Sequence, residues 1–220
     1  FDINAELVQT LRETGKEDLL EELEFERASA NHSYIRQRQL LGLGHAVLCA
    51  QPFVCNEPFV LALGDSIIGL GAKSTAVRRM IECFSEQCAA AVVAFEEVPR
   101  SEVHQYGIAK PKGGGEVFEL EDLVEKPSAD EAPSNMAVAA RYVLSPSIFE
   151  ALQRTPPGKN GEIQITDALR LLIRGGAKVY GMRLRPDERR YDIGNFDSYF
   201  RAFVEFALAD ERHGQALRQH

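Results

Sequence analysis

The sequence predicts an α/β fold in which a mostly parallel sheet is covered by helices on both faces. Two apolar runs, PFVLALGDSII at 58–68 and AAAVVAFEEV at 89–98, are typical of strands buried on both sides. They alternate with stretches at helical spacing, such as 74–87, and this alternation favours a parallel sheet between two helical layers. With 220 residues, 45% of them hydrophobic, the chain can bury one substantial core, so we expect a single domain over 1–220.

The first half of the chain shows helix and strand signals in turn. Leucines near helical spacing between residues 3 and 27 predict two short helices separated at Gly15. The further elements expected here are a short strand at 33–37, a helix from about His45, a buried parallel strand ending at Gly64-Asp65, and a helix over 74–87.

The second half begins with the buried run at 89–98. A short helix or turn then leads to a strand at Gly107, and the glycines of PKGGGEV form a hairpin tip before a strand over 119–127. The remaining elements expected are a strand over 134–145, a helix capped by Ser145 or Ser147, a helix from Thr166 closed by Gly175 and Gly176, a strand over 177–184 and a helix over 196–209.

Composition excludes some classes of partner. The formal charge of −8 argues against nucleic acid and anionic membrane surfaces, which select for basic patches. No run approaches the roughly 18 to 20 apolar residues of a membrane span, and nothing resembles an export signal, so we expect a cytoplasmic protein. The four cysteines include no CxxC pair and are expected to be buried, reduced thiols.

Polar residues at the ends of the predicted strands are the candidates for a ligand site, because ligands bind beyond the carboxyl ends of strands in such sheets. Asp65 closes an apolar strand, where it would either hold Mg²⁺ or cap a turn. Asp192 in YDIGN is either a turn residue or a second metal ligand. Gly107 stands at a third strand terminus.

Glu125 and Lys126 stand side by side at a strand end, with Pro127 stopping the strand. They form either a surface ion pair or a carboxylate for sugar hydroxyls beside an ammonium group for a phosphate. Glu162, after a Pro- and Gly-containing loop, is either a second such carboxylate or a residue preceding a helix that Thr166 or Asp167 caps.

The sequence GLGHA places Gly42 and Gly44 before a helix, where a ligand can approach the backbone closely. It is not a Rossmann fingerprint, and no Walker sequence occurs in the chain. His45 is interpreted as a structural residue of the first helical turn. The acidic and basic sites at strand ends, without a nucleophile–base pair, favour binding and orientation of a phosphorylated sugar.

Several collinear motifs together resemble the bacterial UTP–glucose-1-phosphate uridylyltransferases, a family of sugar-phosphate nucleotidyltransferases. The motifs are QRQLLGLGHAVLCA, YGIA, LVEKPSADEAPSNMAVAARYVLSPSIFEAL, TPPGKNGEIQITDAL and YDIGNFDSYFRAFVEFAL, and the resemblance runs from about Phe1 to Ala209. It implies a three-layer α/β/α nucleotidyltransferase (Rossmann-like) fold, Mg²⁺ dependence, and conversion of UTP and α-D-glucose 1-phosphate to UDP-glucose and pyrophosphate. It also implies a homodimer or homotetramer.

The resemblance also implies residue roles. Gln37 and Gly42 would contact the uracil, Asp65 and Asp192 would bind Mg²⁺, and the backbone of Gly107 would approach the sugar. Glu125 and Glu162 would accept glucose hydroxyls, and Lys126 would meet the phosphate bound to the sugar.

The sequence departs from the family in two places. The family's glycine-rich phosphate loop with Thr-Arg is not found, so we expect a chain that lacks this N-terminal portion and is incomplete for catalysis; Ser66 after Asp65 also differs from many relatives. The alternatives are a related enzyme with another base or sugar, such as dTTP, and a non-catalytic protein that binds nucleotide sugars. In the last helix, the stripe of Phe200, Phe203, Val204 and Ala207 is expected to be mostly core, with part of it available as a subunit interface.

Overall fold

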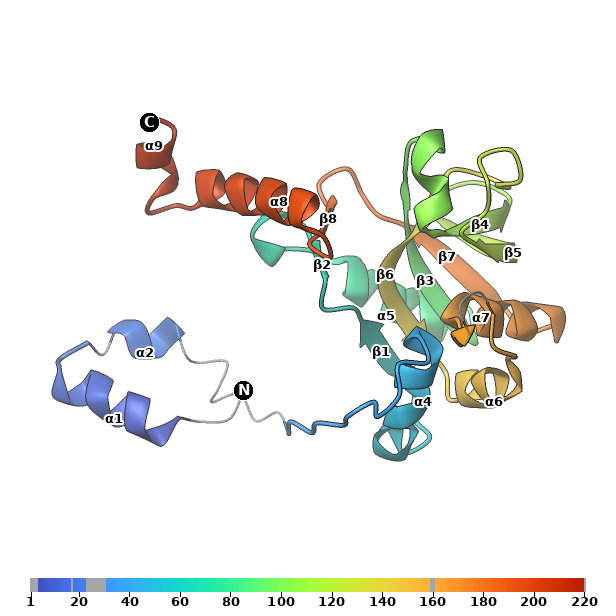
Figure 1. The fold of residues 1–220 in the computed structure, drawn as a ribbon, viewed down its shortest axis with the longest axis horizontal. Helices are drawn as coiled ribbons and strands as arrows, with labels where there is room; N and C mark the ends of the chain where they lie inside the picture. The colour runs from blue at the N-terminus through green and yellow to red at the C-terminus, as the bar shows by residue number, and fades with distance from the viewer. Residues whose placement is uncertain (1–3, 17, 23–30, 159–160, 220) are drawn as a thin grey trace. The chain divides into compact units, whose positions relative to one another are not determined.

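The structure is a computed structural model that describes residues 4–16, 18–22, 31–158 and 161–219 (Figure 1). It divides into two units, Phe1–Arg36 and Gln37–His220. The first unit contains helices α1 (Ala5–Glu13) and α2 (Asp18–Glu22), which confirms the two short helices predicted there; 23–27 lie outside the described residues. The predicted strand at 33–37 is wrong, because residues 31–37 form no strand.

The second unit is built on a six-stranded sheet in the order β1-β6-β3-β7-β5-β4, and β4 also touches the start of β6. The strands are β1 (Phe59–Ala62), β3 (Ala91–Glu97), β4 (Gly107–Lys112), β5 (Val117–Glu125), β6 (Met136–Leu144) and β7 (Val179–Arg183). Among the pairings of these described strands, only that of β3 with β7 is parallel. The α/β fold class is confirmed, but the prediction of a mostly parallel sheet is wrong.

The error has a physical reason. An apolar run indicates that a strand is buried on both faces, but it does not indicate whether the neighbouring strands are parallel or antiparallel. β3 shows this, since residues 91–95 are all buried although the strand has β6 antiparallel on one side and β7 parallel on the other. β1, expected to be a buried parallel strand, is an edge strand antiparallel to β6, and its residues alternate between partly buried and exposed.

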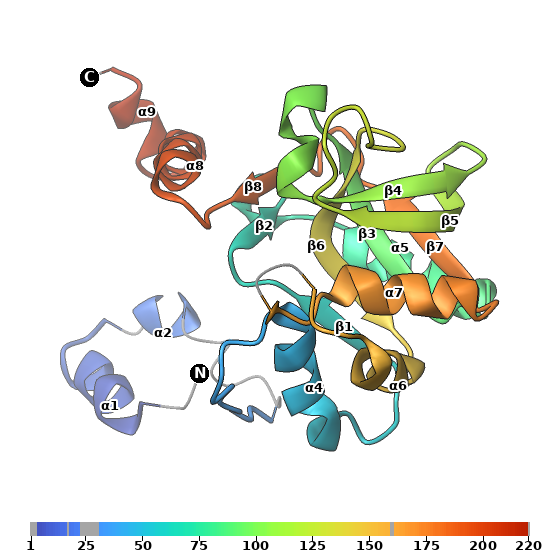
Figure 2. The same cartoon turned by 45° about the vertical axis from the view of Figure 1, so that its right-hand side comes forward.

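Helices cover the sheet on both faces, which gives the predicted three layers (Figure 2). The helices that contribute to the two layers are α4 (Leu43–Val54), α6 (Ser147–Arg154) and α7 (Ile165–Arg174) on one face and α5 (Ala76–Glu86) on the other. Alternate side chains of β3 serve the two cores: Val93 and Phe95 pack with the three-helix layer, and Val92 packs with α5.

Helix starts differ from the predictions in detail. α4 begins at Leu43, so Gly44 lies inside the helix, and α7 begins at Ile165. Neither Ser145 nor Ser147 caps α6 through its side chain, because the two hydroxyls bond each other at 2.6 Å. The predicted capping of α7 by Thr166 or Asp167 is also wrong, since Gln164 occupies the cap position and no side chain caps the helix.

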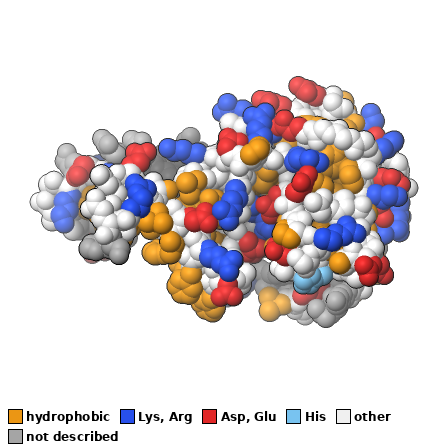
Figure 3. All heavy atoms as spheres, turned by 90° about the horizontal axis from the view of Figure 1, so that it is seen from above, with side chains coloured by type: hydrophobic (Ala, Val, Ile, Leu, Met, Phe, Trp, Pro, Cys, Tyr) orange, Lys and Arg blue, Asp and Glu red, His pale blue; other side chains and the backbone are white. Residues whose placement is uncertain are grey.

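A small second sheet pairs β2 (Ser66–Ile68) with β8 (Arg190–Asp192), antiparallel, and helix α8 (Phe196–Ala209) follows β8. Other short elements among the described residues are the 3-10 helices η1 (Leu70–Ala72) and η2 (Arg100–Gln105) and helix α9 (Gly214–Leu217). The bounds of α8 match the prediction, but its apolar stripe is not core: Phe200 and Phe203 are each 60% exposed. Figure 3 shows hydrophobic side chains at the surface on the face that carries α8.

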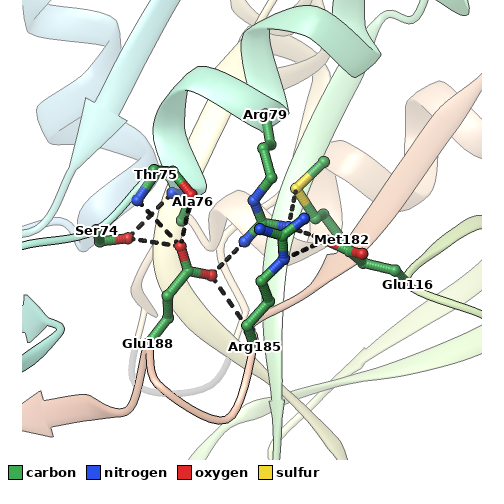
Figure 4. Close-up of polar contacts among 8 residues, drawn as sticks. All are labelled: Ser74, Thr75, Ala76, Arg79, Glu116, Met182, Arg185 and Glu188. Atoms are coloured by element: carbon green, nitrogen blue, oxygen red, sulfur yellow. Dashed lines mark hydrogen bonds and ion pairs between the residues drawn. The ribbon is translucent and has the colours of Figure 1, made fainter.

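A buried ionic network joins α5 to the loop that enters β8 (Figure 4). Glu188, only 2% exposed, accepts hydrogen bonds from Ser74 and Thr75 at the start of α5 and from the backbone N–H of Arg185. It also forms an ion pair with Arg79, which pairs in turn with Glu116. The network fixes the loop from which β8 and Asp192 continue.

The cysteines are free thiols as predicted, but only Cys83 is buried, while Cys55 and Cys88 are exposed. Within the described residues, no helix combines the length and hydrophobicity that a bilayer span requires.

Candidate active site

The hairpin of β4 and β5 brings Gly107 and Glu125 together, because the antiparallel register places the two residues opposite each other. Gly107 begins its strand and Glu125 ends the next one, so they share one edge of the sheet. A Cβ added to Gly107 would lie 3.3 Å from Glu125 Oε2 and 3.2 Å from Thr166 Oγ1. Because Gly107 has no side chain, it leaves space for the Glu125 carboxylate.

Lys126 turns its side chain toward its neighbour instead of the opposite face. Its φ is 45°, a left-handed conformation uncommon for lysine, and its N–H donates to the carbonyl of Tyr106 at 2.9 Å. Its Nζ then lies 4.0 Å from Glu125 Oε1. The reversal at Lys126, followed by Pro127, presents a carboxylate and an ammonium group side by side.

These two residues line a cavity of about 240 Å³ together with Glu162 and with residues of α7. The full lining is Val124, Glu125, Lys126, Glu162, Gln164, Asp167 and Arg170. Arg170 is held by Asp122 at 2.9 Å. Burial alone would raise the pKa of Asp122, but hydrogen bonds from Arg170 and from the Leu123 N–H hold it below its ordinary value. The cavity thus offers acceptors for hydroxyl groups beside cations for an anion.

Glu162 lies against the start of α4, because backbone hydrogen bonds tie its segment there. The N–H of Ile163 donates to the carbonyl of Leu41, and the N–H of Gly44 donates to the carbonyl of Ile163, both at 2.8 Å. A Cβ on Gly42, whose φ is +88°, would lie 2.8 Å from the Cβ of Glu162. Gly42 is therefore required both for its backbone conformation and for this close approach.

Gln37 joins the same region. Its Nε2 donates to the carbonyl of Gly42 at 3.0 Å and lies 2.9 Å from Nδ1 of His45. His45 thus supports Gln37, consistent with its interpretation as a structural residue. The two residues expected at the uracil, Gln37 and Gly42, lie in contact with each other, and Gly42 lies next to Glu162.

Asp65 and Asp192 meet in the small sheet. Ser66 pairs with Asp192, and the N–H of Ile193 donates to the carbonyl of Asp65 at 2.8 Å. A Cβ on Gly194 would lie 3.2 Å from Asp192 Oδ1 and 3.3 Å from Asp65 Oδ2, so both carboxylates face the same glycine.

This pair fits Mg²⁺, which commonly takes one or two carboxylates and fills its remaining positions with water and substrate phosphate oxygens. In the described part of the chain, no three His, Cys, Asp or Glu side chains group so as to hold a metal ion by themselves. A site at Asp65 and Asp192 would therefore need further oxygen atoms from water or from the substrate.

Arg190 links Asp192 to Glu96 and to the ring of Tyr106. It bonds Glu96 and, at 3.1 Å, Asp192, and its guanidinium lies 4.9 Å from the centre of the Tyr106 ring, next to Gly107. Tyr142 is buried in β6, and burial first, then the Glu125 charge, raise the pKa of its phenol.

Arg141 holds the loop that carries Asp65. Its guanidinium donates to the carbonyls of Leu63, Ala140 and Ser66. Ala140 has a φ of 56° inside β6, and its carbonyl accepts the N–H of Leu63 at 3.2 Å. This local distortion of the strand brings the loop and β6 together.

The sequence analysis did not include Thr166, Gln164, Arg190 and Arg141 among the candidate site residues. Gln164 and Thr166 stand in the motif GEIQITD, where they read as the entry to a helix. The sequence alone gives no indication of a role for Arg190 or Arg141, because Glu96, which pairs with Arg190, and Ser66, whose carbonyl accepts from Arg141, are distant in sequence.

Comparison with known proteins identifies the family. The nucleotidyl transferase family matches residues 5–208. UTP–glucose-1-phosphate uridylyltransferase 2 of Staphylococcus saprophyticus subsp. saprophyticus is 40% identical over 212 residues, covering 96% of this chain and 71% of the relative. The chain belongs to the nucleotidyl transferase family.

Solved structures agree. A UDP-glucose pyrophosphorylase complexed with UDP-glucose aligns with a TM-score of 0.78 at 36% identity, over 89% of this chain and 75% of that one. A UTP-bound UGPase from Acinetobacter baumannii aligns with a TM-score of 0.84 at 35% identity, over 100% of this chain and 75% of that one. The predicted nucleotidyltransferase fold and family are confirmed.

Proposed function

We propose that the protein converts UTP and α-D-glucose 1-phosphate to UDP-glucose and pyrophosphate. The observation that carries the proposal is the cavity in which Glu125, Lys126 and Glu162 converge. Two carboxylates that accept hydroxyl groups beside one ammonium group are what a sugar phosphate requires. The relatives named above add UTP as the second substrate.

Each residue then has a role. Glu125 and Glu162 bind sugar hydroxyls, the backbone of Gly107 borders the sugar, and Lys126 binds the phosphate attached to the sugar. Gln37 and Gly42 bind the uracil; their contact with each other, and the closeness of Gly42 to Glu162, support a base site next to the sugar site.

The reaction needs no nucleophile from the protein, since an oxygen of glucose 1-phosphate attacks the α-phosphorus of UTP in line and pyrophosphate leaves. The protein's contribution is to orient the two substrates and to place Lys126 where negative charge gathers. Asp65 and Asp192 would hold Mg²⁺, which, when bound, neutralises charge on the phosphate oxygens.

Further proposals concern the state of the protein. The exposed apolar residues of α8, including Phe200 and Phe203, support a homodimer or homotetramer. The match over 5–208 supports one domain spanning 1–220, and four free thiols support a cytoplasmic location.

Calorimetric titration tests the binding part of the proposal. UDP-glucose should bind more tightly than UDP, and Glu162→Gln should remove most of the difference while leaving UDP affinity unchanged. Equal affinity of the wild-type chain for UDP-glucose and UDP would refute the sugar site. Turnover with UTP against dTTP, and with glucose 1-phosphate against galactose 1-phosphate, tests the choice of substrates.

A further inference from the structure

We propose that Gln164 and Thr166 are positioning residues for the two glutamates of the sugar cavity. Each holds one oxygen of a glutamate carboxylate and leaves the other oxygen for a sugar hydroxyl. The inference rests on the proposed function, and it extends that function to the residues that set which sugar stereochemistry is accepted.

Thr166 holds Glu125. Its Oγ1 donates to Glu125 Oε2 at 2.7 Å, and the threonine is only 4% exposed. It stands in the first turn of α7, where threonine hydroxyls commonly serve the helix backbone, yet here the hydroxyl reaches across to β5. A buried hydroxyl that donates its hydrogen bond to one carboxylate oxygen fixes the orientation of that carboxylate.

Gln164 holds Glu162 in the same way. Its Nε2 donates to Glu162 Oε2 at 2.8 Å. Gln164 occupies the cap position of α7, but its side chain does not cap the helix. Two side chains at the start of one helix are therefore both directed to glutamates of the same cavity.

The remaining oxygens can serve the sugar. Glu125 Oε1 is 4.0 Å from Lys126 Nζ, which is an ion-pair distance but too long for a good hydrogen bond. A hydroxyl of the ligand that donates to this oxygen meets a carboxylate whose rotation is already restricted. Restricting it beforehand lowers the entropy that binding would otherwise cost.

The segment that carries both positioning residues is itself fixed. Ile163, between Glu162 and Gln164, bonds the backbone of Leu41 and Gly44 at the start of α4. The positions of the two accepting oxygens are thereby set by one rigid junction of α4 and α7. Fixed acceptors discriminate between sugars that differ in the direction of a hydroxyl, because a misplaced hydroxyl leaves a polar group unpaired.

Titration of the whole chain with UDP-glucose, UDP-galactose and UDP tests the role of Thr166. Thr166→Val, which removes the hydroxyl at nearly constant volume, should weaken UDP-glucose binding roughly tenfold. It should leave UDP binding unchanged and reduce the preference for glucose over galactose. Thr166→Ser should restore both. The matched control is Thr155→Val, since Thr155 is also buried and its hydroxyl serves the carbonyl of Ala151 in α6.

Gln164→Leu tests the positioning role of Gln164. This residue is only partly buried, so the substitution is less of a risk to folding. It should reduce the sugar-dependent affinity in the same way, while Gln153→Leu, which removes a contact to Gln51 away from the cavity, should not. Circular dichroism confirms folding of each variant.

The outcomes separate the two proposals. Wild-type chain that binds UDP-glucose no better than UDP overturns the proposed function. A second outcome overturns the positioning roles alone. In it, the wild-type chain binds UDP-glucose more tightly than UDP, Glu125→Gln loses this difference, and both Thr166→Val and Gln164→Leu keep it. Equal weakening of UDP and UDP-glucose also overturns them, because it reports a general structural effect.

Discussion

Replacing Glu188 by glutamine is expected to destabilise the fold substantially, although Glu188 binds no substrate in our proposal. One oxygen of Glu188 accepts the hydroxyl of Ser74 at 3.0 Å and the N–H and hydroxyl of Thr75 at 3.0 and 3.2 Å. The other accepts the N–H of Arg185 at 3.2 Å and the guanidinium of Arg79. In Glu188→Gln, the amide oxygen can keep the first set, but the NH₂ group then faces two donors.

The magnitude follows from those two donors. A hydrogen bond to a charged group contributes about 1.5 to 3 kcal/mol, and removing one partner of a buried ion pair costs about 3 to 5 kcal/mol. Arg79 keeps its second partner, Glu116, which compensates part of the loss. We therefore expect the free energy of unfolding to fall by roughly 2 to 4 kcal/mol at neutral pH.

The effect should depend on pH. Burial alone would raise the pKa of Glu188, but the hydrogen bonds and the Arg79 charge outweigh it and hold the pKa below its ordinary value of 4.5. A carboxylate with a depressed pKa stabilises the folded state above its unfolded pKa, and this contribution is lost as the pH falls through the folded pKa. The gap between wild type and Glu188→Gln should therefore narrow below pH 4.5.

Urea unfolding followed by circular dichroism, at pH 7 and at steps below pH 4.5, measures the gap. Glu150→Gln is the matched control: its pair with Arg154 is exposed, so it should change stability by less than about 0.5 kcal/mol. A Glu188→Gln variant as stable as this control at pH 7 would refute the reasoning. So would a gap that stays constant as the carboxylate is protonated.

Three further predictions concern the site. In full-length protein, Lys126→Ala should lower kcat/KM by a factor corresponding to roughly 2 to 4 kcal/mol of transition-state stabilisation, and turnover like wild type in a folded variant would remove Lys126 from the phosphate role. Asp65→Asn should weaken the binding of Mg²⁺ or Mn²⁺, measured by titration in the presence of nucleotide. An unchanged titration curve would place the metal elsewhere. Gly107→Ala should weaken UDP-glucose more than UDP, because its Cβ would lie 3.2 Å from Thr166 Oγ1 and 3.3 Å from Glu125 Oε2; an equal loss for both ligands would contradict this.

The positions of most helices and strands in the second unit could be predicted from the sequence, but not the directions of the strands. Hydrophobic runs such as 89–98 report burial, and glycines such as Gly175 report helix ends. Strand direction depends on which strands pair, and that is decided by contacts between residues distant in sequence. The exposed stripe of α8 was misread for a related reason, since spacing reveals an apolar face without revealing what covers it.

The candidate site shows the same division. Asp65, Gly107, Glu125 and Asp192 were singled out as strand termini of a parallel sheet. The structure brings Gly107 and Glu125 together through an antiparallel pairing instead, in which the start of one strand lies beside the end of the next. Thr166 is an example of a role that the sequence alone does not indicate. A threonine at a helix start predicts a cap, and only the folded chain places Glu125 within hydrogen-bond distance of its hydroxyl.

The β4–β5 hairpin also suggests where the molecule tolerates change. Its ladder runs from Gly107 and Glu125 at one end to a glycine tip, 113–115, at the other. An inserted residue within a strand would shift the register and move Glu125 away from Gly107. Insertions at the tip would leave the register intact, so a fluorescent label or an affinity tag placed there would report on this protein without altering its sugar cavity.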